Sequence, residues 1–218
     1  LGFVPPDQFI SVAEDSGAMA SLGAFILETS CAEFRKILDA CSDGADTLNI
    51  SLNISVAQIL EKNFKDQLLR RLDQYRIRRS QATIEITESM FIDDLDYILP
   101  LLQEIRETGV SISMDDFGTG YSSLSMLRAL PIDELKIDRS FMKHINEIKQ
   151  DSDIIRSIIH MGHTMNIKVL AEGVEEKEQL DLLNSYHCDL YQGYYFSRPL
   201  SAEDFVKFIR GEMMRKCS

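Results

Sequence analysis

The chain has 218 residues, and its 35 acidic against 23 basic side chains give a formal net charge of −12. With 44% hydrophobic and 27% charged residues, its composition is that of a globular protein, which excludes wholesale disorder. The acidic balance argues against binding along duplex nucleic acid, which requires a basic face. No apolar run reaches the ~18 residues of a membrane-spanning helix. We therefore expect a cytoplasmic domain that makes no membrane contact itself, although its parent protein could be anchored by other parts.

Taken in chain order, two predicted helices at 7–14 and 22–40 precede a regular alternation of short β-branched runs and helical stretches. The predicted strands lie at 48–54, 83–87, 110–114, 132–137, 168–171 and 188–191. Ser201 and Asp204, which follow Pro199, predict the capped start of a last helix. Strand and helix alternating six times indicate a parallel sheet covered by helices. Without a linker or a low-complexity tract, we expect a single domain over residues 1–218.

Each predicted strand ends in polar side chains of the kind that carry catalysis. In chain order they are Asn53, Glu85 and Glu88, Asp115 and Asp116, Lys136 and Asp138, Glu172 and Glu175, and Gln192. A (β/α) barrel builds its active site at the carboxyl ends of its strands, whereas an open doubly wound sheet usually uses one crevice. Because a closed barrel needs eight strands, the pattern predicts a TIM-like (β/α) barrel that lacks its first two strands.

The strand-end carboxylates point to a metal site. Several carboxylates converging on one barrel mouth repel one another unless cations lie among them. Hard oxygen ligands of this kind, with the Asn53 carbonyl, suit Mg²⁺ or Mn²⁺. The adjacent Asp115 and Asp116 would allow one carboxylate to bridge two ions, as in displacement at phosphorus, and Lys136 could orient the water or stabilise charge. This pattern favours phosphoryl or phosphodiester chemistry, with Mg²⁺-dependent enolate chemistry as the alternative.

Six motifs then stand in order along the chain: Asn-Ile-Ser at 53–55, Glu-Ile-Thr-Glu-Ser at 85–89, Asp-Asp-Phe-Gly-Thr-Gly-Tyr-Ser-Ser-Leu at 115–124, Leu-Lys-Ile-Asp-Arg-Ser-Phe at 135–141, Ala-Glu-Gly-Val-Glu at 171–175, and Gln-Gly-Tyr-Tyr-Phe-Ser-Arg-Pro-Leu at 192–200. Together they closely resemble the EAL-domain family of bacterial cyclic di-GMP phosphodiesterases, from residue 4 to about residue 208. The resemblance implies hydrolysis of cyclic di-GMP to linear pGpG with Mg²⁺ or Mn²⁺. It also implies a homodimer and an upstream sensor or GGDEF-type domain in the parent protein.

The resemblance implies a role for every strand-end residue. The implied metal ligands are Asn53, Glu85, Asp115, Asp116 and Glu172. Lys136, near the attacking water, and Glu172 are the expected catalytic residues. Asp138, Glu175 and Gln192 are expected to support the site or contact the substrate. Glu88 is expected to anchor the loop that begins with the two aspartates.

One departure from the family pattern is visible. The Glu-Ala-Leu tripeptide, whose glutamate is a metal ligand, and the arginine that follows it do not occur in this sequence. This agrees with the count of two missing strands. If the 218 residues were the whole molecule, we would expect weak metal binding and largely lost turnover; the alternative is a parent that carries the segment. The second hypothesis is a non-catalytic EAL-like receptor for cyclic di-GMP or a protein-interaction module. The otherwise complete set of carboxylates, with the lysine, favours the enzyme.

Overall fold

The computed structural model describes residues 4–5, 9–10, 12–13, 16, 18–41, 44–91, 95–118, 124–143, 145–146 and 148–216. Its helices and strands are α2 (Met19–Ala40), β1 (Ile50–Asn53), α3 (Val56–Ile59), α4 (Phe64–Gln74), β2 (Ala82–Thr87), α5 (Leu95–Glu107), β3 (Ser111–Phe117), α6 (Leu124–Ala129), β4 (Glu134–Ile137), α7 (Lys149–Thr164), β5 (Lys168–Glu172), α8 (Lys177–Ser185), β6 (Leu190–Gln192) and α9 (Ala202–Lys216). Short 3-10 turns include η3 (Glu88–Phe91) and η4 (Arg139–Met142). The six predicted strands are confirmed. Of the predicted helix at 7–14 the structure describes residues 9–10 and 12–13, which are helical, and the other four lie outside the described residues.

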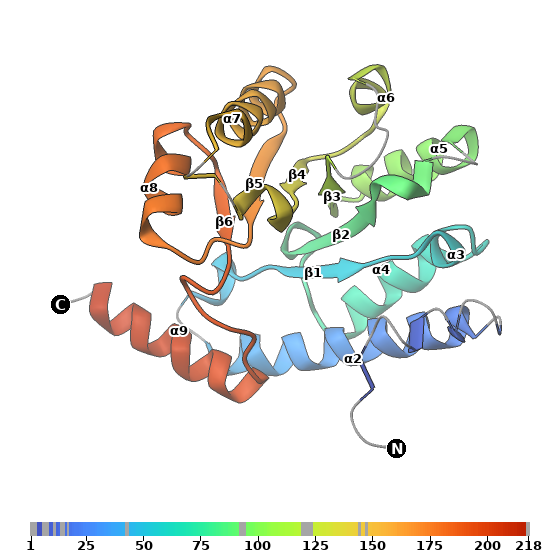
Figure 1. Cartoon of the computed structure of the whole chain (residues 1–218). Helices are drawn as coiled ribbons and strands as arrows, with labels where there is room; N and C mark the ends of the chain where they lie inside the picture. The colour runs from blue at the N-terminus through green and yellow to red at the C-terminus, as the bar shows by residue number, and fades with distance from the viewer. Residues whose placement is uncertain are drawn as a thin grey trace.

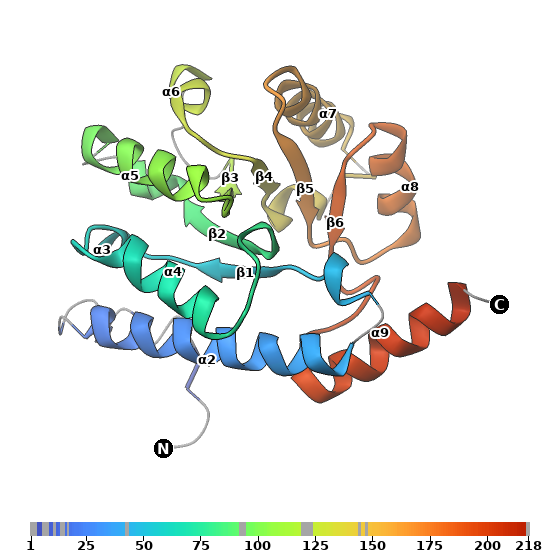
Figure 2. The ribbon, with the colours of Figure 1, turned by 180° about the vertical axis from the view of Figure 1, so that it is seen from behind.

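The six strands form one parallel sheet in the order β1-β2-β3-β4-β5-β6. Every strand therefore pairs with its neighbour in the chain, as in the register of Asn53 with Glu85 and of Thr87 with Asp115. The sheet curls, and α5, α6, α7 and α8 lie outside it while α2 and α9 run beneath β1 (Figures 1 and 2). Among the described strands, β1 and β6 each have one partner. The result is a curled half-barrel, which confirms the prediction of a partial TIM-like α/β barrel.

The apolar core lies between the sheet and the helices rather than inside the curl. Side chains alternate between the two faces of a strand, and the fully buried outer-face residues of the central strands are Ile84, Ile86, Ile112, Met114, Leu135, Ile137, Val169 and Ala171. The inner face instead carries polar residues, among them Ser113 and Lys136, both buried. Aliphatic side chains usually fill a TIM barrel, so this polar inner face distinguishes the fold. Within the described part of the chain, no helix combines the length and the apolar character needed to cross a bilayer.

The last helix is held at its start and near its middle. The Asp204 backbone N–H donates to Ser201 Oγ at 3.2 Å, which confirms the predicted cap of α9. Further along α9, Arg210 Nη2 donates to the Ala40 carbonyl at 2.6 Å, at the end of α2. The two helices therefore pack together across the same side of β1, as both views show.

Two aspartates tie the N-terminal ends of the strands together in the same way. Asp133, just before β4, accepts the Ile112 N–H of β3 at 3.0 Å, and Asp189, just before β6, accepts the Val169 N–H of β5 at 2.8 Å. Each aspartate also contacts a helix side chain. Asp133 accepts a hydrogen bond from Arg106 of α5 at 2.9 Å, and Asp189 is 2.9 Å from His163 of α7. These ties hold the β3–β4 and β5–β6 pairs together at the N-terminal rim of the sheet, at the end opposite to the polar residues.

Candidate active site

Lys136 lies at the centre of the polar cluster, with a side chain only 4% exposed. Its Nζ is 2.7 Å from Glu172 Oε1, 2.9 Å from Asp115 Oδ1 and 3.2 Å from Glu85 Oε1. Burial lowers the pKa of Lys136, but the hydrogen bonds to Glu172 and Asp115 outweigh it and hold the pKa above its usual value. Side chains from four neighbouring strands therefore meet at this site. The ammonium group of Lys136 neutralises part of the negative charge of the three carboxylates.

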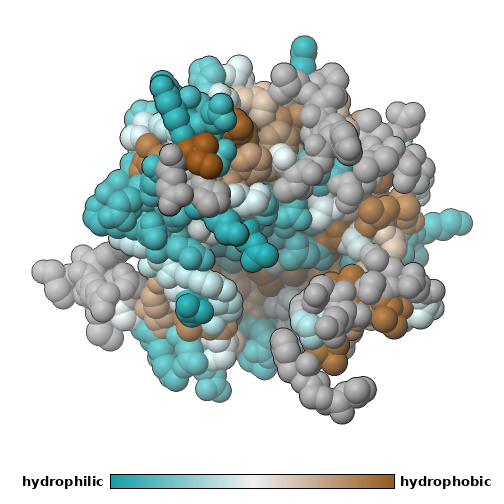
Figure 3. Space-filling model, in the orientation of Figure 1, coloured by the Kyte–Doolittle hydropathy of each residue, from teal (hydrophilic) through white to brown (hydrophobic). Residues whose placement is uncertain are grey.

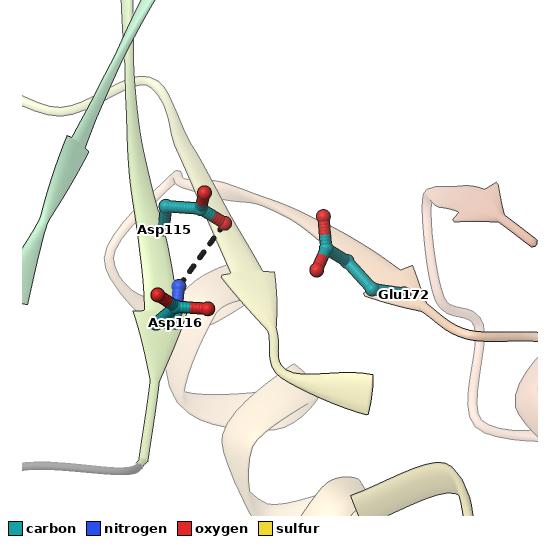
Figure 4. A group of neighbouring side chains, drawn as sticks. All are labelled: Asp115, Asp116 and Glu172. Carbon is teal, nitrogen blue, oxygen red and sulfur yellow. Dashed lines mark hydrogen bonds between the residues drawn. The ribbon is translucent and has the colours of Figure 1, made fainter. Parts of the chain in front are cut away.

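Two aspartates and a glutamate form the part of this cluster that could hold a metal ion. Asp115, Asp116 and Glu172 each offer an oxygen, and these oxygens lie within 4.8 Å of one another. Figure 4 shows the aspartates on β3 facing Glu172, which comes from the end of β5. An all-oxygen, anionic donor set of this kind fits a hard divalent cation.

The backbone of β3 explains why consecutive aspartates can serve one site. Neighbouring side chains of a regular strand point to opposite faces. Here the register with β4 shifts between Met114 and Phe117, and Asp116 has a left-handed φ of 55°. Its N–H donates to Asp115 Oδ1 at 3.1 Å (Figure 4). Such a conformation is costly for a residue other than glycine and is often found at functional sites. The irregularity brings both carboxylates to the carboxyl end of the sheet.

The pKa values in the cluster show that burying carboxylates close together disfavours their ionised forms. Burial raises the pKa of Glu172, against the lowering effect of Lys136. Burial also raises the pKa of Asp116, and the charges of Asp115 and Asp138 add to this effect. A cation beside such a carboxyl group stabilises its ionised form. The donor set and its charge thus both fit the expected divalent ions.

A pocket of about 420 Å³ opens beside the carboxylates. It is lined by Asp116, Asp138, Arg139, Glu172, Gly173, Glu175, Gln192, Gly193 and Tyr194. Asp138 Oδ1 accepts the Ser140 N–H at 3.0 Å at the start of η4. Burial raises the pKa of Asp138, but this hydrogen bonding prevails and lowers it. The space-filling view shows a hollow near the centre of the molecule, with hydrophilic residues above it and hydrophobic residues within it (Figure 3).

The structure therefore divides the predicted site residues into groups. Glu85, Asp115, Asp116, Lys136 and Glu172 come together in the cluster, whereas Asp138, Glu175 and Gln192 line the adjoining pocket.

The two remaining predicted residues lie on the β1–β2 side. Asn53 is exposed at the end of β1, in register with Glu85. Glu88 is buried at the start of η3, which packs against β3. The loop that Glu88 is expected to anchor continues into residues 119–123, which lie outside the described part of the chain.

Sequence reasoning missed three features of the site. Ser113 Oγ donates to Glu134 Oε1 at 2.8 Å, one layer below the cluster. Arg139 and Tyr194 line the pocket. The signal for the Ser113–Glu134 pair was the two-residue period of a strand: Glu134 lies two residues before Lys136, and Ser113 two before Asp115. Tyr194 follows Gln192 at the same interval, although beyond the end of β6.

Together, the fold and the site define an α/β-barrel domain with a cluster of acidic residues at the carboxyl ends of its strands. This cluster could hold a metal ion. The EAL domain family matches residues 1–199, so the chain belongs to this family. It is 39% identical over 209 residues to the cyclic di-GMP phosphodiesterase NbdA of Pseudomonas aeruginosa, a match that covers 96% of this chain and 26% of the relative.

Two further comparisons concern MucR. The chain is 38% identical over 208 residues to the bifunctional diguanylate cyclase/cyclic di-GMP phosphodiesterase MucR of Pseudomonas aeruginosa, covering 94% of this chain and 30% of the relative. A solved structure of the PaMucR phosphodiesterase in complex with c-di-GMP superposes with a TM-score of 0.85 at 37% identity, covering 93% of this chain and 81% of that one. The chain thus spans between a quarter and a third of the length of these curated relatives.

Proposed function

We propose that this domain hydrolyses one phosphodiester of cyclic di-GMP to linear pGpG, with Mg²⁺ or Mn²⁺ as the cofactor. The observation that carries the proposal is the cluster of carboxylates around Lys136, which opens onto a pocket in a chain of the EAL family. Enolate chemistry has no such support, because relatives of this chain are named cyclic di-GMP phosphodiesterases.

In the proposed reaction, a water oxygen bonds to phosphorus and the bond from phosphorus to the ribose O3′ breaks. The products are a 5′-phosphate and a 3′-hydroxyl, and the proton lost by the water balances the proton gained by O3′. Bound divalent ions supply Lewis acidity, which acidifies water and draws charge from the phosphate. The proposed ligands from this chain are Asn53, Glu85, Asp115, Asp116 and Glu172.

Lys136 and the pocket residues act around that centre. The ammonium group of Lys136 holds Glu172 and Asp115 in position and supplies N–H donors for the water or the developing phosphoryl charge. Asp138, Glu175 and Gln192 are proposed to contact the substrate or to support the site, because they line the pocket. Glu88 is proposed to anchor the loop that follows β3.

The wider assembly is also proposed from particular observations. We propose that residues 1–218 form a single EAL-type domain that acts in the cytoplasm beside a sensor or GGDEF-type domain, as the much greater length of the relatives suggests. A homodimer is proposed through the side of the molecule that carries α6 and α7. An apolar pocket of about 590 Å³ there includes Phe117, Ile154, Ile158 and Met161, and Ile154 is exposed.

The second candidate function is a receptor that binds cyclic di-GMP without turnover. It would use the same pocket beside the carboxylates, which binding without turnover also requires. The missing Glu-Ala-Leu tripeptide favours neither function, because the parent protein could carry it. The carboxylates around Lys136 favour the enzyme, because a receptor has no need of them.

One incubation separates these functions. The chain is mixed with cyclic di-GMP and Mg²⁺, and both released product and protein-retained ligand are measured by chromatography. We expect pGpG from the wild type and from Asp181→Asn, a control on the exposed side of α8, and only slowly if no segment carrying the Glu-Ala-Leu tripeptide is present. Asp115→Asn should lower the rate by about 100-fold or more. Intact ligand retained without product would identify a receptor, and neither product nor retained ligand would refute both.

A further inference from the structure

An exposed aromatic ring stands in the wall of the active-site pocket. Tyr194 lines the pocket together with Glu172 and Gln192, and 51% of its surface is exposed. It is absent from the apolar core of the described residues, unlike Tyr191 three positions earlier, which packs against that core. A large ring that contributes nothing to that core, yet borders a polar pocket, is well suited to bind a flat ligand.

One face of this ring is covered by a charged side chain. The guanidinium carbon of Arg198 lies 4.7 Å from the centre of the Tyr194 ring. This is a cation–π contact, which places a flat cation on one face and restricts the orientation of the ring. The opposite face can take a second flat group. Proteins bind the bases of unpaired nucleotides in this way, between or upon aromatic and guanidinium planes.

The backbone on both sides of Tyr194 is fixed to the neighbouring strand connection. The Val174 N–H donates to the Gln192 carbonyl at 3.0 Å, and the Tyr195 N–H donates to the Val174 carbonyl at 2.9 Å. The approach is so close that a Cβ on Gly193 would lie 2.1 Å from the Val174 carbonyl oxygen. The ring is therefore presented by a rigid turn, so little conformational freedom is lost when a ligand binds.

The neighbouring aromatic residues do not share this placement. Tyr195 and Phe196 contact each other edge to face, with ring centres 5.3 Å apart. Neither is among the residues that line the pocket. Tyr195 is also exposed, at 40%. It therefore provides a matched control of the same residue type in the same turn.

From these observations we propose that Tyr194, with Arg198 behind it, is a stacking platform for a nucleobase. The inference rests on the proposed function and deepens it, because the base would be one guanine of the cyclic dinucleotide whose phosphodiester lies at the carboxylates. Tyr194 thereby favours substrates with an aromatic base over other phosphodiesters. Its contribution is to binding and specificity, since the ring does not belong to the carboxylate cluster.

The chain contains no tryptophan, which offers a direct test. In Tyr194→Trp the indole emission comes from that position alone, and cyclic di-GMP should quench it as the guanine stacks on the ring. In Tyr195→Trp the same titration should leave the emission unchanged. Quenching at neither position, while calorimetry shows binding to both variants, would overturn the platform.

Affinity provides a second measurement that does not depend on fluorescence. Tyr194→Leu should weaken cyclic di-GMP binding roughly 5- to 100-fold, the range of one base–aromatic stack. Tyr194→Phe should bind like the wild type, and so should Tyr195→Leu. In turnover, KM should rise for Tyr194→Leu while kcat stays the same, because the base lies away from the reacting phosphorus.

The outcomes separate the platform from the proposed function. If the wild type binds cyclic di-GMP and Tyr194→Leu binds it equally well, the platform alone is refuted. A Phe variant as weak as the Leu variant would also refute it, because the hydroxyl and not the ring face would then be responsible. A wild type that neither binds nor hydrolyses cyclic di-GMP refutes the proposed function and the platform together. Thermal melts of each variant by circular dichroism exclude loss of the fold as the cause.

Discussion

Replacing Lys136 with methionine keeps an unbranched side chain of similar length and removes the ammonium group at the centre of the site. Glu85, Asp115 and Glu172 would then face one another without their shared cation. Removing one partner of a buried ion pair typically costs about 3–5 kcal/mol of folding free energy. The three carboxylates are 10–16% exposed, so water screens them in part. We therefore expect a loss at the lower end, about 3 kcal/mol, which is a large share of ordinary domain stability.

Urea unfolding at pH 7, with and without Mg²⁺, measures this loss. In EDTA, the free energy of unfolding of Lys136→Met should be lower than that of the wild type by the full amount, about 3 kcal/mol. With saturating Mg²⁺ the difference should shrink, because ions that bind only the folded state stabilise it and offset the carboxylate charge. Lys168→Met is the matched control, since Lys168 is exposed at the opposite end of β5. Its change should stay within about 0.5 kcal/mol.

Two results would refute this reasoning. If Lys136→Met were as stable as the wild type in EDTA, the ammonium group would not be compensating the carboxylates in the folded protein. If the loss were the same with and without Mg²⁺, the carboxylates would not take up divalent ions.

Two further substitutions test the surroundings of the cluster, and a third in α9 serves as a control. Burial raises the pKa of Glu134 despite the Ser113 hydrogen bond, so the folded state holds the proton more tightly than the unfolded chain. Glu134→Gln should therefore raise the urea midpoint at pH 7, and the gain should vanish as pH falls below the ordinary value of 4.5, where both states are protonated. Gly193→Ala places a Cβ 2.1 Å from the Val174 carbonyl oxygen and should cost about 1–3 kcal/mol in the same assay, with weaker cyclic di-GMP binding. Gly211→Ala, where a Cβ meets nothing within 4 Å in α9, should instead gain about 0.5–1 kcal/mol; equal effects at both glycines would contradict the close approach.

The strands were predictable because each is a short β-branched run whose outer face is buried by helices. The ends of the strands were harder to predict, as β3 shows. It was predicted to end at residue 114, yet it continues to Phe117 through a left-handed Asp116. Nothing in a run of residue types reveals such a bulge, because it depends on the register with β4. Both aspartates nevertheless lie at the same edge of the sheet, with carboxylate oxygens within 4.8 Å of one of Glu172, so their assignment to one site stays a prediction that this geometry supports.

The composition of the site could be predicted, but its contacts could not. Carboxylates at successive strand ends must converge, and the sequence places Lys136 among them. Whether its ammonium group meets one carboxylate or three depends on the curl of the sheet, which is a property of the whole packing. The Ser113–Glu134 pair escaped notice because a serine in an apolar strand and a glutamate at a strand start each have ordinary explanations. Their hydrogen bond exists only once β3 and β4 are in register.

The aspartate ties at the N-terminal rim have a consequence for how the molecule moves. Asp133 and Asp189 each bind a backbone amide of the preceding paired strand as well as a side chain from a helix. We therefore expect thermal fluctuation to be unevenly distributed along the β3–β4 and β5–β6 pairs, with the N-terminal ends held by these side chains and the carboxyl ends less restrained. On this expectation, small rotations of the strands about the N-terminal rim would widen or narrow the mouth without any strand leaving its neighbours.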